Sequence, residues 1–184
     1  MRARLMDATI ECLVEHGFGG TSTTLISERA GVSRGAQLHH FPTKNDLVVA
    51  AVGHLTEVRG AELAAAAAAV PRGPHRTRDV LRMLGDHFAS PVFTAALELW
   101  VAARTDPTLL AAVSPLELRV GRETHRMTVD LLGADESRPG VRELVQATLD
   151  LVRGLGLAGT ITDDTRRRKR ILDQWARTLD GALA

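Results

Sequence analysis

Side chains that could hydrogen-bond with the edges of nucleic acid bases gather in one short segment of the sequence. Arg34, Gln37, His39 and His40 lie between the glycine at position 31 and the phenylalanine at position 41. Guanidinium, amide and imidazole groups carry donors and acceptors, and base edges in the major groove of DNA present complementary ones. The segment therefore has the chemistry of a helix that reads bases.

The neighbouring histidines could also indicate a metal site. Adjacent residues on a helix point about 100° apart, so at most one of His39 and His40 would face an ion. The sequence has no glycine-rich phosphate loop, His-Glu-x-x-His motif, cysteine pair or Gly-x-Ser-x-Gly motif. We therefore expect no metal, no cofactor and no enzymatic activity.

Capping signals predict two short helices that position these side chains. Thr21 or Ser22 can cap a helix that runs to about residue 30, Gly31 breaks it, and Ser33 can cap a third helix that reaches about residue 40. Four apolar residues are spaced to lock the two helices together: Ile26, Ala30, Val32 and Leu38. On spacing alone, this is either a DNA-binding helix-turn-helix or a plain helical corner.

The rest of the chain also predicts helices. Leu5, Ala8, Cys12 and Leu13 keep the spacing of a first helix, with Gly17 where its C-terminal cap belongs. Thr43 can cap a fourth helix over 44–70. Residues 71–76 predict a loop, which a helix over 77–89 follows. Pro91, Pro107 and Pro115 each follow a capping residue and predict helix starts. Helices over 141–157 and 164–183 complete an all-α fold of about nine helices, without the two-residue alternation of strands.

Composition limits the possible partners. The net charge of the 184 residues is +1, and residues 1–46 hold equal numbers of basic and acidic side chains, so non-specific attraction to DNA is expected to be modest. The single cysteine, Cys12, excludes an intramolecular disulfide and fits a reducing cytoplasm. No segment has the length and apolarity of a membrane span, and we expect no membrane partner.

Residues 5–47 resemble the N-terminal domain of the TetR family of bacterial transcription regulators. GVSRGAQLHHFPTK, residues 31–44, follows that family's pattern of Gly-Val-Ser, a small residue pair, an aromatic, His-Phe and a downstream Lys. Gly17-Phe18 and Thr21-Ser22 also match, and LELWVAARTDP, residues 97–107, matches more loosely. The sequence departs where the family usually has Leu-Tyr, because it has Gln37-Leu38 there.

The resemblance implies a helix-turn-helix DNA-binding domain over residues 1–46 and a ligand-binding and dimerisation domain over residues 47–184. The recognition helix would run from Ser33 to His40, with Arg34 and Ala36 facing bases. The residues that would contact phosphates or the groove wall are Ser22, Thr23, His39, His40 and Lys44. Because Gln37 is polar at a normally apolar position, we expect it to turn outward as a second base reader.

The family's second domain holds a ligand pocket, and larger side chains of this chain suggest its lining. The candidates, whose simpler interpretation is ordinary core, are His87, Phe88, Phe93, Trp100, His125 and Met127. The last two helices carry apolar stripes that would either bury within the chain or pair with a second copy, as in the family. The candidate dimer residues are Leu144, Thr148, Val152, Leu155, Leu172, Trp175 and Leu179.

The resemblance therefore predicts a cytoplasmic repressor. It would bind a palindromic double-stranded operator as a homodimer and be released by a small, mainly apolar effector. The alternative is a helical nucleic-acid-binding or scaffold protein that senses no ligand.

Overall fold

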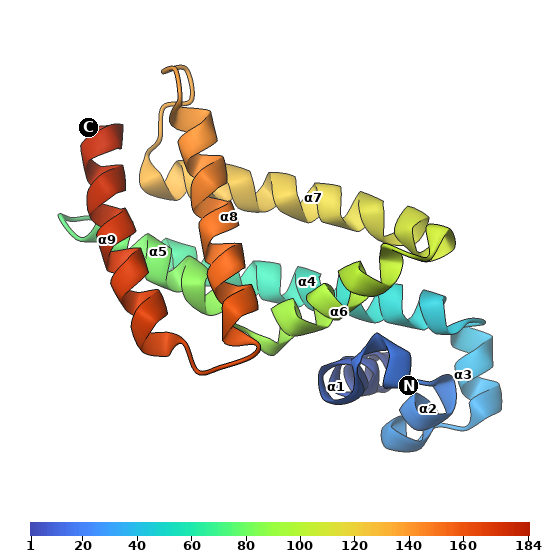
Figure 1. Cartoon of the computed structure of the whole chain (residues 1–184). Coiled ribbons are helices and arrows are strands. Elements are labelled where there is room, and N and C mark those ends of the chain that lie inside the picture. Colours follow the sequence, from blue (N-terminus) through green and yellow to red (C-terminus); the bar gives the residue numbers. More distant parts are fainter. The chain divides into compact units, whose positions relative to one another are not determined.

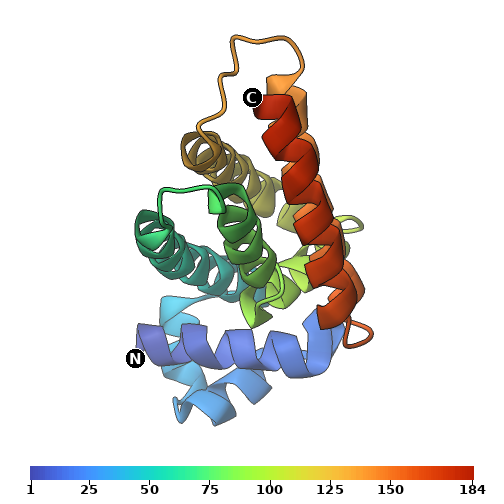
Figure 2. The same cartoon turned by 90° about the vertical axis from the view of Figure 1, so that its left-hand side faces the viewer.

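The computed structural model describes the backbone of all 184 residues and the side chains of all but residues 55 and 59. Over these residues the fold has nine α-helices and no strand, which confirms the all-α prediction (Figures 1 and 2). Among them, none is long and apolar enough to cross a membrane. The helices are α1 (Arg2–Gly20), α2 (Thr23–Ala30), α3 (Arg34–His40), α4 (Lys44–Ala69), α5 (Arg76–His87), α6 (Pro91–Ala103), α7 (Pro107–Leu132), α8 (Val141–Gly159) and α9 (Thr165–Leu183).

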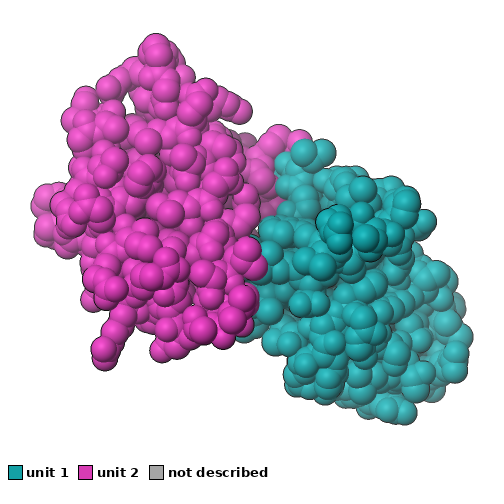
Figure 3. Space-filling view, viewed as in Figure 1, with its two compact units in different colours: residues 1–59, 91–119 teal, residues 60–90, 120–184 magenta. Residues whose placement is uncertain are grey.

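The chain forms two compact units, coloured separately in Figure 3. Unit 1 contains residues 1–59 and 91–119, and unit 2 contains residues 60–90 and 120–184. Helix α4 belongs to unit 1 up to residue 59 and to unit 2 from residue 60, and α7 is divided between residues 119 and 120. The predicted division into two functional domains at residue 46 stays a prediction.

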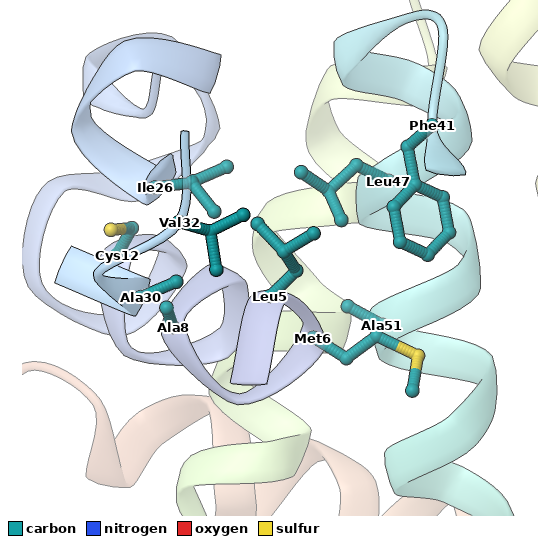
Figure 4. Close-up of a cluster of buried hydrophobic side chains, with 10 residues drawn as sticks. All are labelled: Leu5, Met6, Ala8, Cys12, Ile26, Ala30, Val32, Phe41, Leu47 and Ala51. Atoms are coloured by element: carbon teal, nitrogen blue, oxygen red, sulfur yellow. The ribbon is translucent and has the colours of Figure 1, made fainter. Parts of the chain in front are cut away.

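In unit 1, α1 packs on α2 and α6, and α2 packs on α3. Figure 4 shows buried side chains of α1, α2 and α4 together with one residue on each side of α3. They are Leu5, Met6, Ala8, Cys12, Ile26, Ala30, Val32, Phe41, Leu47 and Ala51. Burial raises the pKa of the Cys12 thiol, which keeps it protonated and makes it an inert core residue. Because this core is continuous, the short helices α2 and α3 are held by α1 and α4.

Capping residues bound α2 and begin α4 where the sequence predicts. The Ser22 hydroxyl accepts a hydrogen bond from the backbone N–H of Leu25 at 3.1 Å. Gly31 follows α2 with φ of 59°, a left-handed conformation that glycine adopts without steric cost. Thr43 caps α4, because its hydroxyl accepts from the backbone N–H of Asp46 at 3.0 Å and donates to the Asp46 carboxylate at 2.7 Å.

Two helix boundaries differ from their predictions. Gly17 breaks the helical conformation with φ of 65°, as expected of a cap, but a further helical turn carries α1 on to residue 20. The predicted start at Pro115 is wrong, because Pro115 lies inside α7. The hydroxyl of Ser114 donates backward to the carbonyl of Leu110 at 2.7 Å, so Ser114 supports the preceding turn and does not cap a new helix.

In unit 2, α5 packs against α8 and α9, which also pack against each other. The helices α5 and α9 approach closely at Gly85, where a Cβ atom would lie 2.7 Å from a methyl carbon of Leu172. Most of the apolar stripe on α8 and α9 that is predicted to face a second copy packs inside unit 2 instead. Its members Thr148, Val152, Leu155, Leu172 and Leu179 are buried within the chain. Their assignment to a dimer interface is therefore wrong for this conformation.

Candidate nucleic-acid interface

Helix α3 has one buried face and one open face, and Gln37 lies on the buried one. The Gln37 side chain has no exposed surface, and its Nε2 donates to the backbone carbonyl of Phe41 at 2.6 Å. The expectation that Gln37 turns outward is therefore wrong. Its neighbour Leu38, predicted to lock the helices together, is 46% exposed. Gln37 is thus buried, as expected of Leu38, and Leu38 is exposed, as expected of Gln37.

Arg34 opens α3 on its exposed side. Among the described cationic side chains of the first 46 residues, it alone has no hydrogen-bond, ion-pair or aromatic partner. Arg4 donates to the carbonyl oxygens of Ala30 and Gly31 at the end of α2. The guanidinium of Arg2 lies 5.4 Å from the Phe41 ring centre. A free guanidinium at the start of a recognition helix can bind a base edge through two hydrogen bonds.

Acidic neighbours neutralise a further arginine of the helix-turn-helix. Arg29 donates to the Glu15 carboxylate at 2.6 Å, and Glu11 lies 3.9 Å away. The hydrogen bond from Arg29 holds the pKa of Glu15 below its usual range. This pair ties α2 to α1 and leaves no excess of positive charge there.

Lys44 is also engaged within the chain. Its Nζ donates to the backbone carbonyl of Phe18 at 2.5 Å and lies 4.0 Å from the centre of the Phe18 ring. Burial lowers the pKa of the Lys44 ammonium. Lys44 therefore binds the end of α1 through Phe18. Its contact with a phosphate stays a prediction.

Hydroxyl and imidazole groups occupy the remaining predicted contact positions. Ser22 and Ser33 are exposed caps of α2 and α3, and a capping hydroxyl that accepts a hydrogen bond keeps its O–H for donation to a phosphate. Thr23, the first residue of α2, is partly buried. His39 and His40 are exposed, and their ring centres lie 5.4 Å apart in an edge-on arrangement.

Ala36 offers less surface than its neighbours on α3. It is partly buried and packs against the core of the first unit. Gly35 is exposed, and a Cβ atom there would meet nothing within 4 Å. The exposed residues of α3 are thus Arg34, Gly35, Leu38, His39 and His40, which form its open face. The backbone can approach a partner closely at Gly35.

Comparison with known proteins identifies the kind of protein that carries this exposed face of α3. Residues 5–51 match the family described as bacterial regulatory proteins, tetR family. The chain is 28% identical over 176 residues to the HTH-type transcriptional regulator CymR of Pseudomonas putida, covering 92% of this chain and 84% of CymR. The chain is a TetR-family regulator.

Solved structures agree with this assignment. The multidrug binding protein EbrR, complexed with imidazole, shares 27% identity with a TM-score of 0.66, covering 95% of this chain and 93% of EbrR. A member of the TetR family from Streptomyces coelicolor has the same fold with 24% identity and a TM-score of 0.66, covering 95% of this chain and 96% of its own. The fold of this regulator therefore matches solved structures over 95% of the chain and not only in the helix-turn-helix.

The six effector candidates of this TetR-family regulator fall in both units. In unit 1, the rings of Phe93 and Trp100 lie edge-on with centres 5.9 Å apart. The indole N–H of Trp100 is buried and has no hydrogen-bond partner among the described residues. A buried donor without a partner is costly, and an acceptor on a bound molecule would satisfy it.

The other four candidates belong to unit 2. Phe88 is buried beside His87 and under the guanidinium of Arg153, which lies 5.6 Å from the Phe88 ring centre. His125 contacts a Glu136 carboxylate oxygen at 2.8 Å. Met127 lines a hollow of about 420 Å³ whose walls come from the end of α4 and from α7. One pocket that contains all six residues stays a prediction.

The outer surface of α8 and α9 in the TetR-family regulator carries a mainly apolar groove. The groove has a volume of about 650 Å³ and is lined by Ala147, Asp150, Leu151, Arg170, Ile171, Gln174 and Trp175. The Trp175 indole N–H donates to the Thr148 hydroxyl at 2.9 Å, which fixes the ring at the groove. Of the predicted dimer residues, Leu144 and Trp175 are partly exposed.

Proposed function

We propose that this regulator is a repressor that binds a palindromic operator as a homodimer through α3. The observation that carries the proposal is the exposed, unpartnered guanidinium of Arg34 at the start of α3. The N-terminal residues of a recognition helix contact base edges in the major groove. Residues 1–46 would bind DNA in the cytoplasm, and residues 47–184 would pair the chains and bind an effector.

A second copy of the chain is the partner that we propose for the groove on α8 and α9. The groove is apolar where Leu151, Ile171 and Trp175 meet, and it carries both an acidic and a basic side chain, Asp150 and Arg170. A two-fold axis that pairs Asp150 of one chain with Arg170 of the other forms this contact twice. Two neutral helix-turn-helix units acting together supply the affinity that one cannot.

The proposed effector is a small, mainly apolar molecule that lowers operator affinity. EbrR, a protein with a similar sequence and fold, is described as a multidrug binding protein. The Phe93–Trp100 pair, with its unpartnered indole N–H, is the site that we favour. A ligand that prefers one of two conformations by about 1–3 kcal/mol changes operator affinity by 5- to 150-fold.

Removal of the Arg34 guanidinium tests the proposal. Arg34→Ala is expected to cost about 1–3 kcal/mol per half-site and to relax base preference at one position, because a bidentate contact to a base is lost. The measurement is the affinity of the variant for a selected operator and for each single-base change in it, by fluorescence anisotropy. Arg122→Ala, which removes an exposed guanidinium from α7, is the control. The proposed role of Arg34 fails if Arg34→Ala leaves the ranking of operator variants unchanged.

A further inference from the structure

Leu38 gives the open face of α3 an apolar group that the sequence pattern does not explain. Its side chain is 46% exposed, while the polar Gln37 beside it is fully buried. The other exposed residues of α3 are an arginine, a glycine and two histidines. Nearly half of the leucine surface is open to a partner, and the side chain has no hydrogen-bonding group for a phosphate.

The helix places Leu38 beside Arg34. Four residues at about 100° each bring the two side chains to within about 40° around the helix axis. They are separated by about 6 Å along the axis, at about 1.5 Å per residue. Because base pairs stack about 3.4 Å apart, a helix that brings Arg34 to one base pair brings Leu38 to a pair about two steps away.

The major groove offers a leucine one apolar partner, the C5-methyl group of thymine. The open backbone at Gly35, which lies on the same face as both side chains, allows the helix to approach the base edges closely. We infer that Leu38 determines operator specificity by contacting a thymine methyl group about two base pairs from the base that Arg34 reads. This inference rests on the proposed function.

Replacement of thymine by deoxyuridine tests the contact at the level of one methyl group. The full-length protein first selects its operator from a random duplex library. Each thymine of a half-site is then replaced by deoxyuridine, which keeps the pairing and removes only the methyl group. For one thymine in each half-site we expect about a fourfold loss of affinity per half-site, equivalent to the ~0.8 kcal/mol of one buried apolar carbon.

Three variants assign the lost contact to its side chain. Leu38→Ala is expected to bind the thymine and deoxyuridine operators equally, and its exposed position should keep the fold, as circular dichroism will check. Arg34→Ala is expected to bind more weakly but to keep the fourfold difference. Leu110→Ala, which removes a leucine of α7 that is 48% exposed, is the matched control and should behave as the wild type.

The possible outcomes separate this inference from the proposed function. If the protein selects an operator but no deoxyuridine weakens it, or if Leu38→Ala keeps the penalty, the inference is overturned and the proposed function stands. If Leu38→Ala weakens all duplexes equally and changes the oligomeric state, Leu38 contacts a second chain and the inference is again overturned. If no duplex is selected, the proposed function fails, and the inference fails with it.

Discussion

The side-chain amide of Gln37 uses only part of its hydrogen-bonding capacity in the core of the helix-turn-helix. Its Nε2 donates to Phe41, which ends α3, while its Oε1 is buried without a partner in the described part of the chain. The amide therefore closes the helix end, and the unpaired oxygen reduces what it contributes. Gln37 therefore acts on stability, whereas the role that we propose for Arg34 is base recognition.

Gln37→Ala is expected to lower the free energy of unfolding by about 1–3 kcal/mol, because it removes the bond to Phe41 and leaves a cavity. The ranking of single-base operator variants should not change, because Gln37 has no exposed surface. Urea denaturation and operator titrations measure the two quantities. His39→Ala, an exposed change on the same helix, should leave stability unaltered. A changed base ranking in Gln37→Ala would show that Gln37 does read DNA.

At the scale of elements, the end of α1 is tied to two other helices of unit 1. The backbone N–H of Phe18 donates to a Glu98 carboxylate oxygen of α6 at 3.2 Å, and its carbonyl accepts from Lys44 of α4. Gly17, with its positive φ, turns these groups toward their partners, and a Cβ atom there would lie 2.8 Å from the Glu98 carboxylate. Side chains of α4 and α6 thus fix the helix that supports α2 and α3.

A double-mutant cycle tests this tie. Glu98→Ala should cost about 1–2 kcal/mol of stability through the lost bond to a backbone N–H. Gly17→Ala should cost about 1–3 kcal/mol, because an L side chain is strained at this φ and clashes with Glu98. The two costs should add to more than that of the double variant, because Glu98→Ala removes the clash. Strict additivity in urea denaturation would mean that Gly17 and Glu98 do not interact.

The sequence predicts most elements because capping signals are local. Pro91 and Pro107 begin helices as expected, and the Asp106 carboxylate accepts from the backbone N–H of Leu109 at 3.0 Å. At Pro115 the same signal fails, because a serine hydroxyl can also bond to the turn before it. The exchange at positions 37 and 38 has a different cause. The buried face of a short helix is decided by its packing in the fold, here beside α2, which the local sequence does not contain.

For the whole molecule, the family resemblance gave the architecture but not the faces that pack. A stripe of apolar residues on α8 and α9 predicts burial but does not say whether the same chain or a second chain covers it. Five of the seven predicted dimer residues are buried within the chain. The effector residues show the same limit, since they divide between the two units. Contacts between distant parts of a chain are set by the fold as a whole.

The effector is expected to change the environment of Trp100. The chain has only two tryptophans, Trp100 and Trp175, so Trp175→Phe reports Trp100 alone. A molecule that releases the operator should change the Trp100 emission over the same concentration range, and Trp100→Ala should lower its potency. If effectors release DNA without either change, the binding site lies elsewhere, and the hollow lined by Met127 is the next candidate.

The mass of the protein on its operator tests the central claim, that two chains joined through α8 and α9 read one palindrome. Light scattering should find a dimer at micromolar concentration and two chains per duplex, with half-sites about 34 Å apart. Ile171→Arg should give a folded monomer that loses operator affinity, and Leu118→Arg, at an exposed leucine of α7, should remain a dimer. A wild-type monomer that binds its operator tightly as one chain per duplex would contradict the claim.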